Sequence, residues 1–225
     1  MWFEFNGIRS SDYNIETELF PLMLVPVRNV TSIVIPGMDG SLTQSDDTYS
    51  DMSYPIQVRA TDDCPFELIH SWLNGSGDLI ISDDPGKKYK ARFDSRSLNE
   101  DFFSCFRVTL NFFVHPFKYE AEPETIELTS SGTIYNPGTR KSYPIITVYG
   151  AGDLTIGDYE LTIEATGGED YVIINSEIQE CYYDTSTSRN SKVTGDFPVL
   201  DPGEISITIG AGITRVDFQG NWRWF

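Results

Sequence analysis

The sequence predicts a mainly β protein with two domains and a single α-helix. Apolar and polar residues alternate with a period of two in almost every informative stretch, as they do in strands with one buried face. Turn residues follow these stretches at short intervals, and one stretch has the spacing of an amphipathic helix. A chain of 225 residues is long enough to bury a core in each of two β domains.

The first half contains the strongest strand signals. Phe3 and Phe5 share a face ahead of the turn signal Asn6-Gly7. Residues 78–82 and 88–93 flank Asp83-Asp84-Pro85-Gly86 and predict a hairpin. The most regular strand covers 106–114, in which every second residue is apolar: Phe106, Val108, Leu110, Phe112 and Val114. One face of this strand is therefore expected to lie in a core.

The helix is predicted within TDDCPFELIHSWLNGSG, residues 61–77. Asp62 and Asp63 are suitable N-caps, Pro65 suits the first turn, and Gly75 stands where a helix would end. Its apolar stripe comprises Phe66, Leu68, Ile69, Trp72 and Leu73. We expect this helix to pack on a sheet, with His70 in a structural rather than a chemical role.

A long polar segment precedes the helix. Within residues 31–60, the stretch from Pro36 to Ser53 is rich in Gly, Ser, Thr and Asp. It is too long for a simple turn in a compact domain. We therefore expect an extended loop at about 36–53 that is either mobile or in contact with something outside its own domain.

The boundary between the domains is predicted near residue 118. Residues 116–127, PFKYEAEPETIE, contain two prolines and a cluster of acids and are typical of a connector. Beyond them, short strand signals recur without a second helical pattern, which predicts an all-β sandwich. These signals cover residues 144–150, 154–156, 159–163, 171–178 and 204–210, and Gly210-Ala211-Gly212 is expected to be a hairpin turn.

The composition is strongly acidic, with a formal net charge of −18. Residues 1–118 carry 10 basic and 17 acidic side chains, and residues 119–225 carry 6 and 17. This balance disfavours duplex nucleic acid and anionic membranes as partners, because both require cations at the contact. No apolar run reaches the length of a signal sequence or a membrane span, so we expect synthesis in a cytoplasm without insertion into a membrane.

The sequence offers no clear catalytic or metal centre. Cys64, Cys105 and Cys181 have no metal-like spacing, and the two histidines add no zinc motif, so buried free thiols are expected. Neither a Gly-x-Ser-x-Gly turn nor a phosphate-binding loop is present. Hard oxygen ligands for calcium are available in one loop at Asp46, Asp47 and Asp51, but their spacing matches no EF-hand. We expect no enzyme activity and no cofactor.

The last ten residues, VDFQGNWRWF, place large rings at the end of an acidic chain. Thr214, Val216 and Phe218 alternate as a final strand, and Trp222 and Trp224 continue the same parity beyond Gly220. We therefore expect this segment to pack on the second domain with at least one buried tryptophan. The candidates for this packing are Phe218, Trp222, Trp224 and Phe225.

Several motifs resemble the distal tail (Dit) proteins of phages with long non-contractile tails. In the second half these are NPGT at 136–139, YPII at 143–146, DLTI at 153–156, IINSEIQECY at 173–182, GDFPVLDPGE at 195–204 and the closing ITRVDFQGNWRWF. FEFNGIRSSDYNI at 3–15 and IPGMDG at 35–40 resemble the opening strand and loop of the family. Glu204-Ile205 and Met38 depart from its usual pattern.

The resemblance implies a structural protein of a phage or prophage tail tip, and therefore a location in the virion. Residues 1–118 would form a β-sandwich or split-barrel-like ring domain with one helix, and residues 119–225 a galectin-like β-sandwich outside the ring. The ring would be a hexamer that joins the tail tube to the baseplate and lets DNA pass. Expected partners are the tail-tube protein and the baseplate hub protein, and further candidates are the tape measure protein and receptor-binding proteins.

The resemblance also assigns a role to the long polar segment, which would embrace the neighbouring subunit. The subunit-interface candidates are Ile35, Pro36, Gly37, Met38, Asp39, Gly40, Ser41, Leu42 and Tyr49. A rival reading is a carbohydrate-binding module, motivated by tyrosines at 149, 159, 182 and 183 in a predicted sandwich. A glycoside hydrolase with a carboxylate pair is the remaining alternative.

Overall fold

The computed structural model describes residues 1–21, 24–60, 66–94, 107–165, 168, 170–184 and 187–225. Within these residues the chain forms two compact units, Met1–Ala121, with which Phe225 is grouped, and Glu122–Trp224. Each unit has a hydrophobic core of its own. Strands dominate both, and the described residues include one α-helix, so the predicted mainly β class is confirmed.

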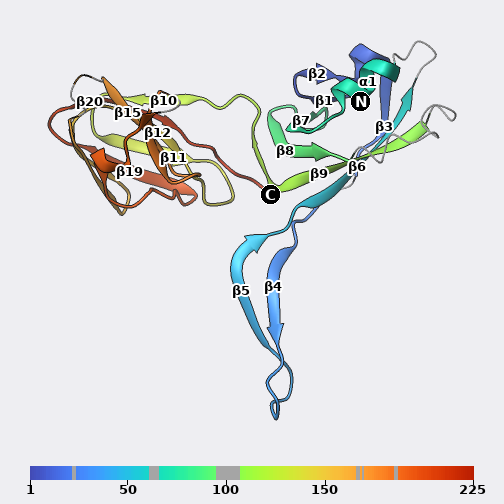
Figure 1. The fold of residues 1–225 in the computed structure, drawn as a ribbon, viewed down its shortest axis with the longest axis horizontal. Coiled ribbons are helices and arrows are strands. Elements are labelled where there is room, and N and C mark those ends of the chain that lie inside the picture. The colour runs from blue at the N-terminus through green and yellow to red at the C-terminus, as the bar shows by residue number, and fades with distance from the viewer. Residues whose placement is uncertain (22–23, 61–65, 95–106, 166–167, 169, 185–186) are drawn as a thin grey trace. The chain divides into compact units, whose positions relative to one another are not determined.

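The first unit is built on one antiparallel sheet with the strand order β2-β1-β7-β8-β9-β6-β3 (Figure 1). The strands are β1 (Phe3–Phe5), β2 (Ile8–Arg9), β3 (Ile15–Leu19), β6 (Met52–Ala60), β7 (Ser76–Ile81), β8 (Lys87–Phe93) and β9 (Arg107–Glu120). A 3-10 turn, Ser10–Tyr13, connects β2 to β3. Alternate side chains of β6, β8 and β9 are buried, so one face of the sheet lies in the core.

The helix α1 (Phe66–Trp72) packs on the core face of this sheet. Ile69, Trp72 and Leu73 are buried, and the Trp72 ring stacks on Phe3 at 5.5 Å between centroids. Leu68 was expected in the same stripe, but it is 51% exposed because α1 is short and turns a narrow face to the core. His70 is exposed. The expected caps Asp62, Asp63 and Pro65, and Cys64, lie outside the described residues.

Strand β9 is longer than the sequence suggested. Residues 116–120 were assigned to the connector, but they continue the strand to Glu120. Pairing with β8 shifts register between Tyr89 and Ala91, opposite His115, Pro116 and Phe117. Proline has no N–H to donate to the ladder, so a bulge at this point lets the strand continue past it. Phe106 and Cys105 lie outside the described residues.

The second unit is a sandwich of two antiparallel sheets (Figure 1). One sheet contains β10 (Thr125–Leu128), β20 (Ile213–Gln219), β12 (Ile145–Gly150), β15 (Tyr171–Asn175), β16 (Glu180–Tyr183) and β17 (Thr187–Ser188), in this order. The other contains β11 (Gly132–Asn136), β19 (Gly203–Ile209), β13 (Gly152–Ile156), β14 (Tyr159–Ile163) and β18 (Val193–Thr194). Aliphatic residues from both sheets fill the core between them.

Two connections between these sheets pass each other at one end of the sandwich. Residues 150–152 join β12 to β13, and residues 210–212 join β19 to β20. The amide of Gly210 donates to the carbonyl of Asp153 at 2.8 Å. A Cβ on Gly212 would lie 2.3 Å from the carbonyl oxygen of Ala151, so only glycine fits there. We call this place the glycine crossing. It corrects the expected hairpin turn, because β19 and β20 lie in different sheets.

The final strand β20 also departs from its predicted pattern at one end. Val216 and Phe218 are buried as expected, but Thr214 is exposed and Ile213 is buried in its place. Pairing with β12 shifts register after Tyr149, where Gly150 faces Ile213. Because of this shift, Ile213 and Thr214 lie on the opposite faces of the sheet from those that simple alternation along β20 predicts.

Candidate subunit interface

The segment expected as a loop is a β-hairpin that we call the arm, residues 28–49. Its strands β4 (Arg28–Ile33) and β5 (Leu42–Tyr49) pair with each other and with no other described strand. Residues 28–48 are all exposed. This corrects the expected loop at 36–53, of which residues 42–49 belong to β5 and 52–53 to β6. The β-branched residues Val30, Thr31 and Ile33 favour strand in β4 despite the polar composition of the segment.

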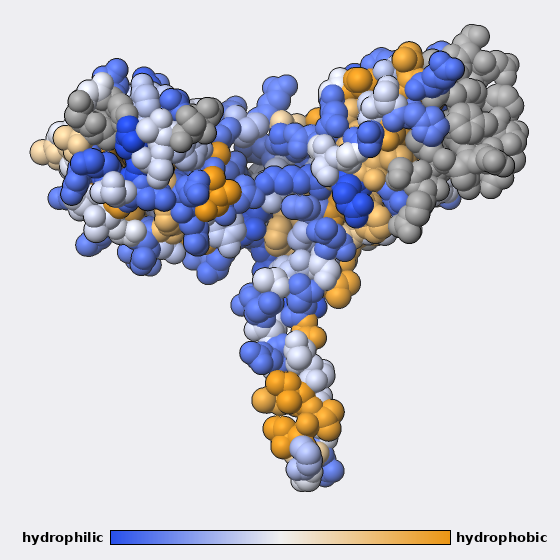
Figure 2. Space-filling model, in the orientation of Figure 1, coloured by the Kyte–Doolittle hydropathy of each residue, from blue (hydrophilic) through white to orange (hydrophobic). Residues whose placement is uncertain are grey.

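The free end of the arm is apolar. Figure 2 shows apolar residues gathered towards this end. The tip, which we define as residues 33–42, exposes Ile33, Val34, Ile35, Met38 and Leu42, and Val34 is 75% exposed. Ile33 faces Leu42 across the two strands. Soluble proteins rarely expose apolar side chains in such a group unless another surface covers them.

The half of the arm nearer the sheet is polar and braced by its own hydrogen bonds. The Asn29 amide donates to Thr48 Oγ1 at 2.8 Å, and Thr48 Oγ1 donates to the Asp46 carboxylate at 2.6 Å. Arg28 pairs with Asp47. The hydroxyl and amide of Thr48 lower the pKa of Asp46. These bonds stiffen a two-stranded ribbon that would otherwise be marginally stable in water.

The structure divides the expected interface residues into two places. Ile35, Pro36, Gly37, Met38, Asp39, Gly40, Ser41 and Leu42 lie together at the exposed tip. Gly37 and Gly40 have positive φ angles, as the turn requires. Tyr49 lies at the other end of the arm, half-buried, with its ring 5.7 Å from that of Phe117. The tip also exposes Ile33 and Val34, which lie in the apolar run SIVIP and were not among the expected residues.

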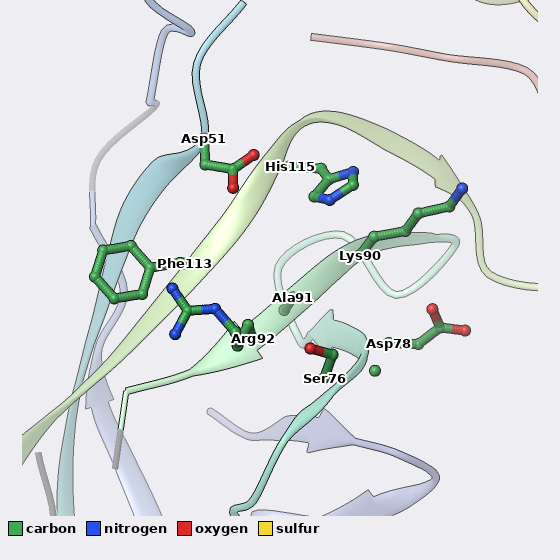
Figure 3. A pocket seen from close by; sticks show the side chains of 9 residues that line it. Asp51, Ser76, Asp78, Lys90, Ala91, Arg92, Phe113 and His115 are labelled. Atoms are coloured by element: carbon green, nitrogen blue, oxygen red, sulfur yellow. The ribbon is translucent and has the colours of Figure 1, made fainter. Parts of the chain in front are cut away.

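A shallow pocket of about 460 Å³ opens on the outer face of the first unit's sheet (Figure 3). Lys90 and Arg92 of β8 and His115 of β9 bring basic groups to it, and Asp51 lies at its rim. The Arg92 guanidinium lies 4.8 Å from the centre of the Phe113 ring. Among the described residues no carboxylate pairs with Arg92. The pocket thus combines an apolar ring with an available cation.

The structure does not bring the calcium candidates together. Asp46 accepts from Thr48, Asp47 pairs with Arg28, and Asp51 lines the pocket. Over the described part of the chain, no group of three or more His, Cys, Asp or Glu residues is placed to hold a metal ion. In the same residues no helix has the length and apolarity to cross a bilayer.

The closing segment contributes to the core of the sandwich. Phe218 and Trp222 are buried there, Trp222 with 5% exposure, and Trp224 packs against them from the edge. The Trp224 indole donates to the carbonyl of Pro137 at 3.2 Å, and the carbonyl of Arg223 accepts from the amide of Thr139 at 2.9 Å. Phe225 is 43% exposed and is not part of this core. The segment beyond β20 is therefore tied down by packing and by backbone bonds.

The whole chain has the fold of a phage hub protein of the Dit class. It is similar over 100% of its length to the crystal structure of the Dit protein (gp 19.1) of SPP1, with a TM-score of 0.71 and 99% of that chain covered. That protein is described as a paradigm of the hub adsorption apparatus in phages infecting Gram-positive bacteria. The two sequences are 16% identical, so the likeness concerns the fold. No family model and no curated protein sequence matches this chain.

Proposed function

We propose that this chain is a structural distal tail protein of a phage or prophage with a long non-contractile tail. In this proposal six copies form a ring at the tail tip, and each arm embraces the neighbouring subunit. The observation that carries the proposal is the apolar tip at the end of an exposed arm, in a chain whose whole length shares the fold of SPP1 Dit. A surface of this kind is stable in water when a partner covers it.

Burial of the tip is the main source of free energy for association in this proposal. Complete burial of one large aliphatic side chain contributes about 1.5–3 kcal/mol. The tip exposes five such side chains, and association costs several kcal/mol in lost freedom of motion. The braced polar half keeps the arm extended before contact, which lowers the part of this cost that ordering would add.

The pocket of Figure 3 is the surface that we propose receives the tip of a second copy. The tip carries one charge, Asp39, between the apolar residues Met38 and Leu42. The pocket offers the Arg92 guanidinium beside the Phe113 ring. A carboxylate flanked by apolar groups complements a cation flanked by an aromatic ring, and the contact fixes orientation more than it adds affinity.

The remaining parts of the proposal rest on the likeness to SPP1 Dit. The first unit forms the ring domain, the second a galectin-like sandwich outside it, and the assembly connects the tail-tube protein to the baseplate hub protein in the virion. DNA passes through the ring, whose acidic composition repels phosphate and limits adhesion. The protein acts by assembly, without catalysis.

The test is the molar mass of the purified protein, measured by light scattering over a range of concentrations. A parallel variant replaces residues 33–42 with Asn-Gly, which joins the paired residues Ser32 and Thr43 by a two-residue hairpin turn. We expect the intact chain to form hexamers and the variant to remain a folded monomer. A control variant, Gln44→Glu, changes the polar half and should assemble normally. A full-length monomer at every concentration would contradict assembly through the arm.

A further inference from the structure

Tyr149 of β12 and Tyr171 of β15 lie side by side on the outer face of the six-stranded sheet in the second unit, and the Tyr183 ring reaches Tyr171 from the end of β16. Tyr149 of β12 pairs with Tyr171 of β15, and their ring centres are 5.6 Å apart. The ring centre of Tyr183 lies 4.8 Å from that of Tyr171. We call these three residues the tyrosine row. Tyr183 was among the tyrosines noted from the sequence, but Tyr171 was not.

The row is not required by the core of the sandwich. The buried side of these strands is supplied by Val148, Val172 and Cys181. The three tyrosines are only half-buried. Burial and the neighbouring Tyr183 raise the pKa of Tyr171. Tyrosine side chains that lie outside a hydrophobic core and have a hydroxyl able to form hydrogen bonds are typical of a contact surface.

Polar groups mark one end of the row. Arg215 of β20 is the partner of Tyr149 in the sheet, and its guanidinium lies 4.0 Å from the centre of the Tyr149 ring. Asp217 holds the same guanidinium at 3.1 Å. Fixed donors and acceptors beside aromatic faces are the combination that holds a sugar, because the rings cover its C–H faces while the polar groups bond to its hydroxyls.

We propose that the tyrosine row binds a neutral oligosaccharide. The charge of the unit selects for a neutral ligand, since residues 122–224 carry 16 acidic and 6 basic side chains and would repel an anionic glycan. In this proposal each tyrosine ring stacks on one sugar unit of the oligosaccharide. Arg215 and Asp217 form hydrogen bonds with the hydroxyl groups of the sugar unit that lies beside Tyr149. This function goes beyond assembly of the tail and does not depend on the ring.

The experiment is a calorimetric titration of the full-length protein with four neutral hexasaccharides: maltohexaose, cellohexaose, laminarihexaose and β-1,4-galactohexaose. We expect weak binding of at least one of them. Tyr171→Ala should lower the affinity for it at least about tenfold, since a central aromatic contact is lost. Tyr171→Phe, which keeps the ring, should bind nearly as well as the original chain, so lost binding in the alanine variant alone identifies stacking.

The control is Tyr135→Ala, which removes a tyrosine that is 62% exposed on β11 of the other sheet and should leave binding unchanged. The absence of binding to all four sugars at about 10 mM, a limit set by the weakest affinities of interest, would overturn the proposal. Equal affinities for the Tyr171→Ala variant and the original chain would also overturn it. Neither result affects the molar mass measured by light scattering. A failure of the sugar-binding proposal can therefore be distinguished from a failure of the proposed hexamer.

Discussion

Gly220 is the residue that allows Trp222 to enter the core. The Trp222 ring folds back over this glycine, and a Cβ at position 220 would lie 2.1 Å from the ring. A rigid indole in a filled core cannot move aside without losing contacts. The sequence indicated Gly220 as a break in the strand, but the closeness of the ring to the glycine follows from the fold.

Gly220→Ala should therefore lower the free energy of unfolding by about 1–3 kcal/mol, the usual effect of forcing an added group into a packed site. The measurement is denaturant unfolding followed by tryptophan fluorescence. Gly86→Ala is the matched control, because nothing lies within 4 Å of a Cβ there and its φ is not positive. Equal stability of the two variants would show that Trp222 is free to move.

Cys181 gives the protein a pH dependence at high pH. Burial raises the pKa of its thiol from 9.0 to about 11. The folded state therefore holds this proton more tightly than the unfolded state does. The stabilisation is fully present below about pH 9 and is lost as the pH rises towards 11, with an upper limit of about 2–3 kcal/mol.

We expect the free energy of unfolding to fall between about pH 9 and 11, with the sign given by proton linkage. The free energy of unfolding of the Cys181→Ala variant should fall less steeply over the same interval, although it is lower at neutral pH. Tyr54 and Tyr89 have pKa values raised by burial and add to the slope in both proteins. Identical slopes would mean that the Cys181 thiol titrates normally. The comparison needs urea unfolding at four or five pH values.

At the scale of single elements, the sequence was informative wherever one face of a strand is buried. Five strands of the sandwich, β12, β13, β14, β15 and β19, and the hairpin of β7 and β8 lie where alternation predicted them, because a one-residue slip would expose every apolar side chain. The arm was misread as a loop, since neither of its faces is buried and its strands therefore have no alternation to show.

Irregularities within elements were also invisible in the sequence. The bulge at Pro116 and the register shift after Tyr149 arise from pairing with a neighbouring strand. Leu68 looked like a core residue of the helix, but the sheet reaches only the side that bears Ile69 and Trp72. Such features depend on contacts between distant segments, which a local pattern does not contain.

The arm yields a charge-reversal prediction. Asp39→Arg and Arg92→Glu should each weaken subunit association by about 0.5–1 kcal/mol, the range for an exposed ion pair, and the double variant should recover part of the loss. Sedimentation velocity over a dilution series measures the change. Asp158→Arg, an equal charge change in an exposed turn of the second unit, serves as control. Additive losses in the double variant would rule out a contact between these two residues.

At the scale of the whole molecule, the sequence showed a mainly β chain and its resemblance to distal tail proteins, and the expected fold is confirmed by the likeness to SPP1 Dit. The two compact units meet in the sequence between Ala121 and Glu122. Which surfaces would meet in an assembly could not be predicted, because an interface is formed by side chains that one chain leaves exposed. The tyrosine row illustrates this, since its members come from three separate strands.

Net charge makes a prediction about the assembly as a whole. Each copy carries a formal charge of −18, so association gathers like charges. Raising the salt concentration from about 20 mM to about 0.5 M shortens the screening length several-fold and should increase the hexamer fraction. One exposed ion pair per contact is too weak to reverse this trend. Light scattering at fixed protein concentration tests it, and a mass that falls with salt would mean that ion pairs, rather than the apolar tip, hold the subunits.

The glycine crossing determines where this protein could be lengthened. Gly150, Gly152, Gly210 and Gly212 each lie so near a backbone carbonyl that a single added carbon would collide with it. A peptide inserted at that end of the sandwich would have to separate both connections at once. The turn at Asp83–Gly86 has open space around Gly86 and no such neighbour. A displayed epitope or an additional module would therefore be tolerated at that turn and rejected at the crossing.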